Sequence, residues 1–461
     1  MSSMERPLPI AVIGAGFSGT MAAIQLLARL PRERSVLLCE RADTFGRGLA
    51  YDTGNDAHLL NLRAANMSAF PDRPRHFEEW LGRLDPATEG AGIRATPAGT
   101  FAARGLFGRY LGELLRQAVT ADGAPRLNLV NDAVIDLEPG PHGFVLRTEG
   151  GQSHRVAGAV LAMGNLATKA APRSRYRADP WHMDDLGRLR VDLPVLIVGT
   201  GLTMVDAVTS LRARGFSGPI TALSRRGLLP NPHASNIPWP LPALTARESA
   251  SLSALLARIR SEIARAAAAG ADWRGVIDGL RPVTDALWRG LPPTEQARFL
   301  RHLRPFWDVH RHRTAPPADA TICAEIARGT LSVRAGRILA ISDGADHAAV
   351  TWRPRGTGDD RKLAVQCILD ATGIGRVEET DDPLLLRLIA RGLVRPGPFG
   401  LGLDAGPDYR TQGTRRSPVL WTLGPLLRGT VWECIAVPDI RNEAADLAGV
   451  IAGTLDPAAA A

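Results

Sequence analysis

Two stretches of the chain share the same order of an apolar strand, a glycine turn and a helix start made of small residues. The first reads IAVIGAGFSGTMAA, residues 10–23, and the second reads VLIVGTGLTMVDA, residues 195–207. An apolar run that ends in closely spaced glycines predicts a buried strand followed by a tight turn. The chain therefore predicts two strand–turn–helix units of the kind that begin a nucleotide-binding fold.

Two later segments alternate apolar and polar residues around glycine turns, which predicts small antiparallel meanders. They span residues 127–165 and 331–375. Each ends in an apolar strand that reaches a small-residue turn, LAMG in the first segment and DATG in the second. Because the pattern repeats after each glycine turn, we predict an α/β protein with two related nucleotide domains.

A helical insertion, residues 230–325, lies between the second glycine unit and the second meander. Within it, Thr245 and Glu248 form a capping-box pattern that predicts the start of a helix. The apolar positions that follow at helical spacing are Leu252, Leu255, Leu256, Ile259 and Ile263. The simplest interpretation of this stripe is a packing face. Substrate contacts or a subunit interface are the alternatives for the insertion.

Composition indicates a folded protein without a nucleic-acid or membrane partner. The 461 residues are 45% hydrophobic and 22% charged, and the net charge of +8 is spread along the chain without a basic run. The four cysteines lie far apart and form no CxxC pair, which argues against a dithiol centre or a zinc knuckle. No apolar run approaches the length of a membrane span, so we expect a cytoplasmic protein.

The first glycine turn has the residues that a dinucleotide site requires. Gly14 permits the tight turn, Gly16 allows the backbone to approach a pyrophosphate, and Gly19 permits close packing of helix and strand. The helix start offers free N–H groups to the phosphates. Glu40 ends the next strand, SVLLCE, where it can accept hydrogen bonds from a ribose. The alternative is a purely structural glycine turn.

The second glycine turn keeps only part of this pattern. Gly199 and Gly201 occupy the two ligand-facing positions, whereas Met204 replaces the glycine that sets helix packing. The change is therefore expected to loosen packing without abolishing phosphate binding. Thr203, at the start of the helix, is included among the expected cofactor contacts.

The strand after the second turn, ITALSRRG, ends in Ser224, Arg225 and Arg226 instead of an acid. Guanidinium groups pair with a 2′-phosphate, which a carboxylate would repel. We therefore predict NADPH at the second turn and FAD at the first. Two solvated arginines are the alternative interpretation of this strand end.

Over nearly its whole length the sequence resembles the two-dinucleotide-binding flavoproteins, and in particular a bacterial FAD/NAD(P)-binding protein family. The motifs that carry the resemblance are IGAGFSG, GRGLAYDT, HLLNLRAANMSAFPD, FAARGLFGRYL, GTGLTMVDA, SRRGLLP, VHRHR, DATG and GPLLRGTVWE. The resemblance implies two Rossmann-like domains in a glutathione-reductase-like architecture. We place a split FAD domain at residues 1–177 and 376–461, around an NADPH domain at residues 178–375.

The block LLNLRAANMSAFPD, residues 59–72, is more distantly similar to flavin-containing and N-hydroxylating monooxygenases. The similarity places Asn61 beside the reactive edge of the flavin, where the matching amide helps to hold a flavin C4a-hydroperoxide. An asparagine that satisfies the backbone of a turn is the alternative. His182 lies roughly at the place of a fingerprint histidine. The preceding aromatic-x-Gly is absent, however, so a hinge or packing role stays open for His182.

Two further segments contain candidate residues. In GPLLRGTVWE, the similarity to flavoproteins suggests Gly424, Trp432 and Glu433 as neighbours of the flavin, with Trp432 as plain core the alternative. In VHRHR, His310 and His312 lack the carboxylate or cysteine pattern that would complete a metal site. Their neighbours, Arg311 and Arg313, are either contacts for an acidic substrate or a phosphate, or they are solvated or structural arginines. The VHRHR motif therefore predicts no metal site.

These patterns favour an FAD-dependent, NADPH-using oxidoreductase. By resemblance it is a monooxygenase that uses molecular oxygen to hydroxylate a small amine, an amino acid or another heteroatom-containing metabolite. The first alternative is a reductase or oxidase that acts on a quinone or imine. The second is a nucleotide-binding redox sensor or partner subunit without turnover. The substrate, the oligomeric state and the catalytic acid or base stay open at this point.

Overall fold

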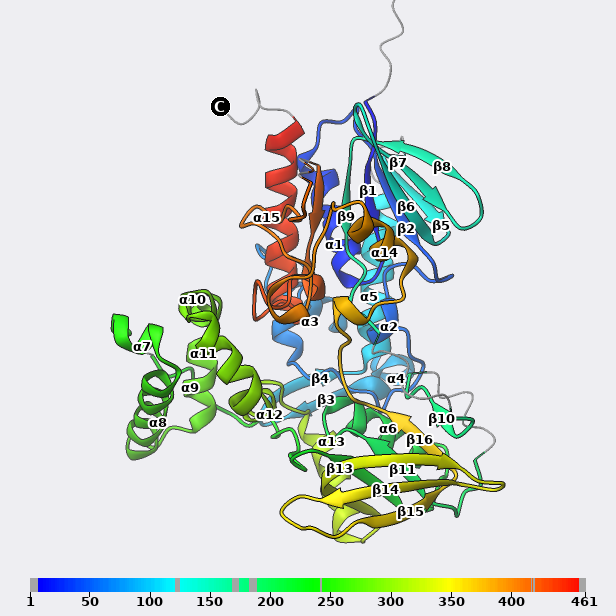
Figure 1. The fold of residues 1–461 in the computed structure, drawn as a ribbon. Coiled ribbons are helices and arrows are strands. Elements are labelled where there is room, and N and C mark those ends of the chain that lie inside the picture. Colours follow the sequence, from blue (N-terminus) through cyan, green and yellow to red (C-terminus); the bar gives the residue numbers. More distant parts are fainter. Residues whose placement is uncertain are drawn as a thin grey trace, which may run out of the picture.

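The computed structural model describes residues 7–120, 125–167, 174–181, 189–240, 243–415, 417 and 419–455. The two largest β-sheets lie at opposite ends of the molecule, and a group of helices projects to one side between them (Figure 1). The first of them is not continuous in the sequence, because its last strand comes near the C-terminus, whereas the strands of the second are consecutive. The fold is mixed α/β with parallel sheets, as predicted.

The first sheet has five parallel strands in the order β17-β9-β1-β2-β5. The strands are β1 (Ile10–Ile13), β2 (Val36–Glu40), β5 (Leu127–Asn131), β9 (Gly158–Leu161) and β17 (Leu420–Thr422). All four residues of β1 are buried, because both faces of the sheet are covered. This burial explains why the strand is apolar at every position.

Helices cover one face of the first sheet, and a meander with one helix covers the other. The first layer contains α1 (Phe17–Arg29), α5 (Arg104–Thr120) and α15 (Val437–Leu455). The second contains β6 (Val134–Gly140), β7 (Gly143–Thr148), β8 (Ser153–Val156) and α14 (Pro383–Ala390). The three strands form a separate antiparallel sheet, so the prediction of a first meander is confirmed.

The second sheet has seven strands in the order β10-β16-β11-β12-β13-β14-β15. The strands are β10 (Arg177–Ala178), β11 (Val195–Val198), β12 (Ile220–Ser224), β13 (Leu331–Asp343), β14 (Ala348–Pro354), β15 (Arg361–Val365) and β16 (Cys367–Asp370). Helix α6 (Leu202–Ala213) follows β11. Its buried residues pack in the same core as those of β11 and β12.

The prediction of a second antiparallel meander is confirmed, because β13, β14 and β15 pair antiparallel, but this meander is part of the second sheet. Residues 331–335 of β13 pair in parallel with β12, and residues 336–343 pair antiparallel with β14. The strand is long enough to serve both partners, so the antiparallel hairpin extends the parallel sheet. The alternating pattern predicted the hairpin correctly, but it carries no information about which sheet the first strand joins.

Most of the insertion forms a group of helices that projects to one side, at a level between the two largest sheets (Figure 1). Its helices are α7 (Ala246–Ala250), α8 (Leu252–Ala268), α9 (Trp273–Leu280), α10 (Thr284–Gly290), α11 (Pro293–Arg298), α12 (Arg304–Arg311) and α13 (Pro316–Ala327). The predicted capping box is confirmed: the Glu248 N–H donates to Thr245 Oγ1, and the Thr245 N–H donates to Glu248 Oε2. Helix α13 packs against α6 and β13, so it belongs to the layer of the second sheet.

Between β2 and α5 the chain forms α2 (Gly48–Tyr51), the 3-10 turn η1 (Ala64–Asn66), α3 (His76–Leu81), α4 (Pro86–Glu89), β3 (Ile93–Thr96) and β4 (Gly99–Ala102). These elements lie between the two largest sheets, with α4, β3 and β4 nearer to the second (Figure 1). Among the helices in the described part of the chain, none combines the length and apolar character needed to cross a membrane. The exact domain boundaries at residues 177 and 375 stay a prediction.

Candidate functional site

The first glycine turn leaves no room for a side chain at Gly14 or Gly19. Gly14 has φ +97°, and a Cβ there would lie 2.5 Å from the carbonyl oxygen of Ala162. A Cβ on Gly19 would collide with the carbonyl oxygen of Gly14. Gly16 caps α1 without a side-chain hydrogen bond, so the N–H groups of the first turn are left for an anion. This geometry fits the pyrophosphate of a dinucleotide.

Glu40 lies at the carboxyl end of β2 and faces the glycine turn. Its Oε2 accepts a hydrogen bond of 2.7 Å from the Ala15 N–H, and its Oε1 accepts one of 3.1 Å from the Ala42 N–H. The carboxylate therefore orders the turn itself, beside the place where a ribose would lie. The predicted ribose contact stays a prediction.

A glycine-rich segment covers the first turn from outside. The Gly46 N–H donates to the Ala15 carbonyl at 2.8 Å. A Cβ on Gly48, which has φ +57°, would lie 2.9 Å from Gly16 Cα. The GRGLAYDT motif therefore packs against the first glycine turn and encloses it from that side.

The second glycine turn repeats the geometry of the first without such a cover. Gly199 has φ +121°, and a Cβ there would overlap the carbonyl oxygen of Ala371, the counterpart of Ala162. A Cβ on Gly201 would meet nothing within 4 Å, and the residue is exposed. Thr203 is half-buried in the first turn of α6. The turn is therefore open at the position that approaches a phosphate.

Met204 is fully buried in the core of the second sheet. The position that requires glycine in the first turn thus holds a large side chain in the second. Met204 contributes to the core between α6 and β11. The predicted looser packing of helix and strand stays a prediction. The larger side chain fills the space between helix and strand.

The two arginines after β12 differ in their surroundings. Arg225 is exposed, whereas the Arg226 guanidinium lies 5.1 Å from the ring centroid of Phe306 in the insertion. Ser224 Oγ lies 2.9 Å from Thr200 Oγ1 and accepts a hydrogen bond of 2.9 Å from the Gly227 N–H. These contacts tie the strand end to the glycine turn. Arg225 is therefore better placed than Arg226 to meet a phosphate.

Asn61 lines a pocket to which three distant parts of the chain contribute. The lining residues are Tyr51, Asn61, Leu62, Met67, Arg311, His312, Ile435, Ala436 and Val437. Val437 begins α15, so the N-terminal end of this 19-residue helix faces the pocket. A helix N-terminus carries a partial positive charge. The pocket therefore combines an amide, a guanidinium, an imidazole and a positive helix end.

Arg311 and Glu433 form a buried ion pair between the insertion and the C-terminal segment. Their atoms Nη2 and Oε2 are 3.0 Å apart, and each side chain is 5% exposed. The interpretation of Arg311 as a solvated arginine is therefore wrong. Removing either partner would leave a charge buried without compensation. The pair thus holds the insertion against the pocket.

Aromatic and acidic residues around the pair of Arg311 and Glu433 add to the contact between the insertion and the C-terminal segment. Trp432 packs against Trp288 and Phe299, with ring centroids 4.8 and 5.0 Å away. Asp285 accepts hydrogen bonds from the N–H groups of Trp432 and Glu433 at 3.0 and 3.2 Å. The interpretation of Trp432 as core is supported by this packing. Trp432 is not among the residues that line the pocket.

Gly424 lies where the C-terminal segment meets α1. It has φ +68°, and a Cβ there would lie 2.6 Å from Ser18 Oγ. Its N–H donates a hydrogen bond of 2.8 Å to Glu443 Oε2. Burial raises the pKa of the Glu443 carboxyl to about 8. A glycine is therefore required for this close approach to the first nucleotide site.

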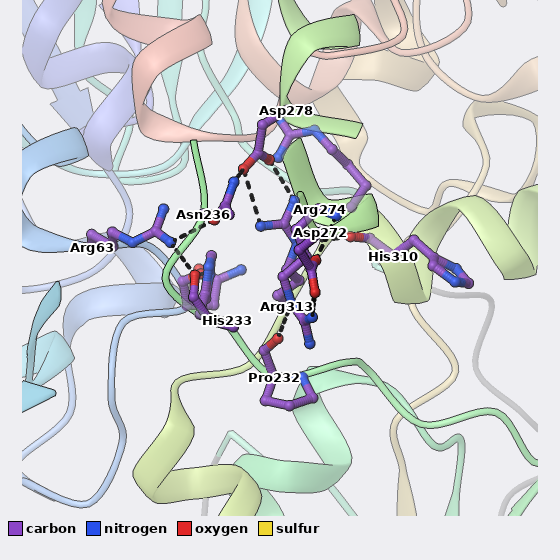
Figure 2. A network of polar contacts seen from close by, with 12 residues as sticks. Arg63, Pro232, His233, Asn236, Asp272, Arg274, Asp278, His310 and Arg313 are labelled. Atoms are coloured by element: carbon purple, nitrogen blue, oxygen red, sulfur yellow. Dashed lines mark hydrogen bonds and ion pairs between the residues drawn. The ribbon is translucent and has the colours of Figure 1, made fainter. Parts of the chain in front are cut away.

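The VHRHR motif sends its side chains in different directions. His310 points away from the polar network (Figure 2) and its ring centroid lies 4.8 Å from that of Trp273. His312 lines the pocket, and burial lowers its pKa to about 4. Arg313 is buried and paired with Asp278, which makes it structural. The described residues contain no cluster of three metal-ligating side chains. His182 lies outside the described residues.

Two contacts that join the domains were not predicted from the sequence. On one side, Arg104 of α5 forms an ion pair of 2.9 Å with Asp206 of α6. On the other, His233 donates a hydrogen bond to the carbonyl oxygen of Asn61 at 2.9 Å. No local pattern announces either contact, because the partners are more than 100 residues apart.

The N-terminal part of the chain matches a known family. Residues 11–166 match the family model that is described as FAD-NAD(P)-binding. No curated protein matches the chain significantly.

Solved structures of flavoproteins share the fold over nearly the whole chain. Ornithine hydroxylase from Pseudomonas aeruginosa has a TM-score of 0.67 at 13% identity, covering 97% of this chain and 100% of the other. L-lysine 6-monooxygenase from Pseudomonas syringae has a TM-score of 0.63 at 18% identity, covering 98% and 99%. Thioredoxin reductase from Lactococcus lactis has a TM-score of 0.52 at 12% identity, covering 97% and 99%. The chain therefore contains an FAD-NAD(P)-binding domain and has the fold of the two-dinucleotide-binding flavoproteins.

Proposed function

We propose that the protein is an FAD-dependent, NADPH-using monooxygenase that hydroxylates a small amine, an amino acid or another heteroatom-containing metabolite. The observation that carries the proposal is the pocket that brings Asn61, Arg311 and His312 to the N-terminal end of α15. In the overall reaction NADPH supplies two electrons, one atom of oxygen enters the substrate, and the other leaves as water. The hydroxylases of ornithine and lysine that share the fold support the same chemistry.

The first glycine turn holds FAD in this proposal. Gly14, Gly16 and Gly19 leave the space for the pyrophosphate, and Glu40 lies beside the ribose. When bound, FAD supplies the acceptor for a hydride from NADPH and the centre that reacts with oxygen. Gly424 brings the C-terminal segment against the same site.

The second glycine turn holds NADPH. Gly199 and Gly201 admit its pyrophosphate, Thr203 lies at the start of α6, and Arg225 pairs with the 2′-phosphate. The ion pair between Arg104 and Asp206 fixes α6 against the domain that holds FAD. The protein thereby sets the distance and angle between the two cofactors, which is its main contribution to hydride transfer.

The pocket provides the place for the substrate. The Asn61 amide is the hydrogen-bonding group on the side of the first domain, and Arg311 and His312 close the side of the insertion. Because burial keeps His312 uncharged near neutral pH, its imidazole can accept a hydrogen bond from an amine N–H. The buried pair of Arg311 and Glu433 helps to exclude water.

The cysteines favour oxygen chemistry over dithiol chemistry. Cys39, Cys367 and Cys434 are buried, Cys323 is exposed, and all four are free thiols. No pair of them can take electrons from a reduced flavin as a disulfide does in a dithiol reductase. Free thiols also fit the reducing cytoplasm, where we place the protein.

Product formation coupled to oxygen tests the proposal. FAD-loaded protein is mixed with NADPH and a panel of amines, and hydroxylated product and hydrogen peroxide are both measured. A monooxygenase converts most of the NADPH into hydroxylated product with the right substrate. Release of all consumed oxygen as peroxide with every amine would instead indicate a reductase or oxidase. Failure of NADPH to bleach the flavin within seconds would indicate a protein without turnover.

A further inference from the structure

The structure assigns a positioning role to His233: we propose that its imidazole holds the backbone of Asn61, and thereby the Asn61 amide, at the pocket. His233 comes from the insertion, whereas Asn61 belongs to the first nucleotide domain. Its Nε2 lies 2.9 Å from the carbonyl oxygen of Asn61. Since a carbonyl oxygen only accepts, Nε2 is the protonated nitrogen. This role rests on the proposed function of Asn61.

The backbone of His233 is fixed before its side chain reaches across. The His233 N–H donates to the Thr314 carbonyl at 3.0 Å, and the Thr314 N–H donates to the Asn231 carbonyl at 3.0 Å. The Asn231 side chain also donates to Val309 at the end of α12, at 2.9 Å. The Asn231 N–H donates to the same Val309 carbonyl at 3.0 Å, so four bonds hold the segment at residues 231–233 against α12 and the residues that follow it. A side chain on such a fixed segment can define a position on its neighbour.

A second contact runs parallel to the first. Arg63 Nη2 donates to the Ala234 carbonyl at 2.9 Å and to Asn236 Oδ1 at 3.1 Å. Asn236 Nδ2 in turn donates to Asp278 at 2.8 Å, and Arg313 pairs with the same carboxylate (Figure 2). The segment around Asn61 is thus joined to the insertion at two points, two residues apart. One point alone would permit rotation about the contact, and two points do not.

The surroundings of the His233 ring keep it in one form. The ring is 8% exposed and its centroid lies 5.4 Å from that of Phe101. Nδ1 is buried without a hydrogen-bond partner among the described residues. Protonation would place a second N–H there, near the guanidinium groups of Arg63 and Arg313, and burial with these charges lowers the pKa of His233 to about 4. The bond to Asn61 therefore has a single tautomer near neutral pH.

The test compares two substitutions at position 233 in the FAD-loaded, full-length protein. His233→Leu removes the donor, whereas the amide of His233→Gln can donate from nearly the same place as Nε2. The measured quantity is the ratio of hydroxylated product to hydrogen peroxide. We expect His233→Leu to lower this ratio by about tenfold or more, since a displaced catalytic group loses its alignment. His233→Gln is expected to stay within about threefold of the unmodified protein.

The control is His310→Leu, which removes an imidazole that points away from the network. We expect it to change the ratio by less than about twofold. The rate of anaerobic flavin reduction by NADPH is expected to stay within about twofold in all three variants, because the positioned group acts after that step. Equal losses in His233→Leu and His233→Gln, or no loss in either, would overturn the assignment.

A second measurement is independent of oxygen chemistry. The visible absorbance spectrum of bound, oxidised FAD is recorded for Asn61→Ala, His233→Leu and the double variant. If His233 acts through Asn61, its substitution shifts the spectrum in the same direction as Asn61→Ala, and the double variant shifts no further than Asn61→Ala. Additive shifts contradict the assignment. If no amine yields a product, the proposed function fails while this cycle still decides the role of His233.

Discussion

The two glycine turns are built on one framework, but one is enclosed and the other is open. In both, a Cβ on the first glycine would meet the carbonyl oxygen of an alanine at the end of the neighbouring strand, Ala162 or Ala371. In the first turn, Gly46 and Gly48 close over the backbone. In the second turn, Gly201 is exposed, and a Cβ there would meet nothing within 4 Å. This difference suits a resident cofactor at the first turn and an exchanging one at the second.

The glycines of the two turns have two different roles: the first permits a positive φ, and the third permits close packing of helix and strand. The third position is glycine in the first turn, where a Cβ would collide with Gly14, and it is a buried methionine in the second. Because neither residue faces the ligand side of its turn, the third position reports how closely helix and strand pack. The first position requires glycine in both turns, since φ is positive in both.

The largest effect is expected from placing a side chain at the third position of the first turn. Gly19→Ala forces a methyl group against the Gly14 carbonyl, which should lower the free energy of unfolding by about 3 kcal/mol or more. The purified protein should also lose most of its FAD. Thermal unfolding and the flavin absorbance of the purified protein measure both effects. By contrast, Gly201→Ala, at the second position of the second turn, has space for the methyl group and should leave stability nearly unchanged while weakening NADPH binding.

Met204→Ala tests the same position in the second turn. It removes a fully buried side chain from the core that α6 shares with the sheet, so we expect a loss of about 2–5 kcal/mol in the free energy of unfolding. Denaturant unfolding followed by circular dichroism measures this loss. A variant as stable as the unmodified protein would show that Met204 does not fill the space between helix and strand.

Substitutions of the two arginines after β12 test whether the second turn binds the 2′-phosphate of NADPH. Arg225→Ala should raise the KM for NADPH by about tenfold or more and change the KM for NADH little, since a charge-assisted contact contributes about 1.5–3 kcal/mol. Arg226→Ala should have a smaller effect, because its guanidinium packs over Phe306. Steady-state kinetics with both cofactors measure the difference. Equal losses for NADPH and NADH would refute the contact with the 2′-phosphate.

The smallest effect, taken per pH unit, is a dependence of the free energy of unfolding on pH. It has opposite signs in two regions of the molecule. Glu443, beside the enclosed site, has its pKa raised to about 8, so its contribution is full below about pH 4.5 and is lost as the pH rises toward 8. His233 and His312 have pKa values lowered to about 4, so their contribution is full above about pH 6.5 and is lost as the pH falls toward 4. Each group changes the free energy of unfolding by about 1.4 kcal/mol per pH unit at most.

Glu443→Gln isolates the first of these contributions. The amide oxygen still accepts from the Gly424 N–H but does not titrate, so the loss of stability between pH 5 and 8 should become shallower than in the unmodified protein. Urea unfolding at pH 5, 6, 7 and 8 measures the slope. Parallel pH profiles for the two proteins would exclude an ionisation of Glu443 in this range.

The nucleotide turns, the first meander and the capping box were predictable from the sequence. Each depends on residues that are close in the chain: Gly14, Gly16 and Gly19 lie within six positions, and Thr245 bonds to Glu248. The surroundings of Arg311 and the contact of His233 with Asn61 were not predictable. Their partners lie 122 and 172 positions away, and no short-range pattern specifies which distant segment will lie opposite.

The sequence by itself determined which residue types stand at the glycine turns and that the chain repeats a nucleotide-binding unit. A turn with φ near +97° or +121° excludes side chains wherever it occurs, so glycine there reports the local backbone directly. Only the tertiary structure decided that β13 extends the second sheet, that Met204 fills a core and that the insertion docks on the pocket through Glu433 and Asn61. The physical reason is that backbone conformation is a local property, whereas burial and pairing depend on which surfaces the folded chain brings together.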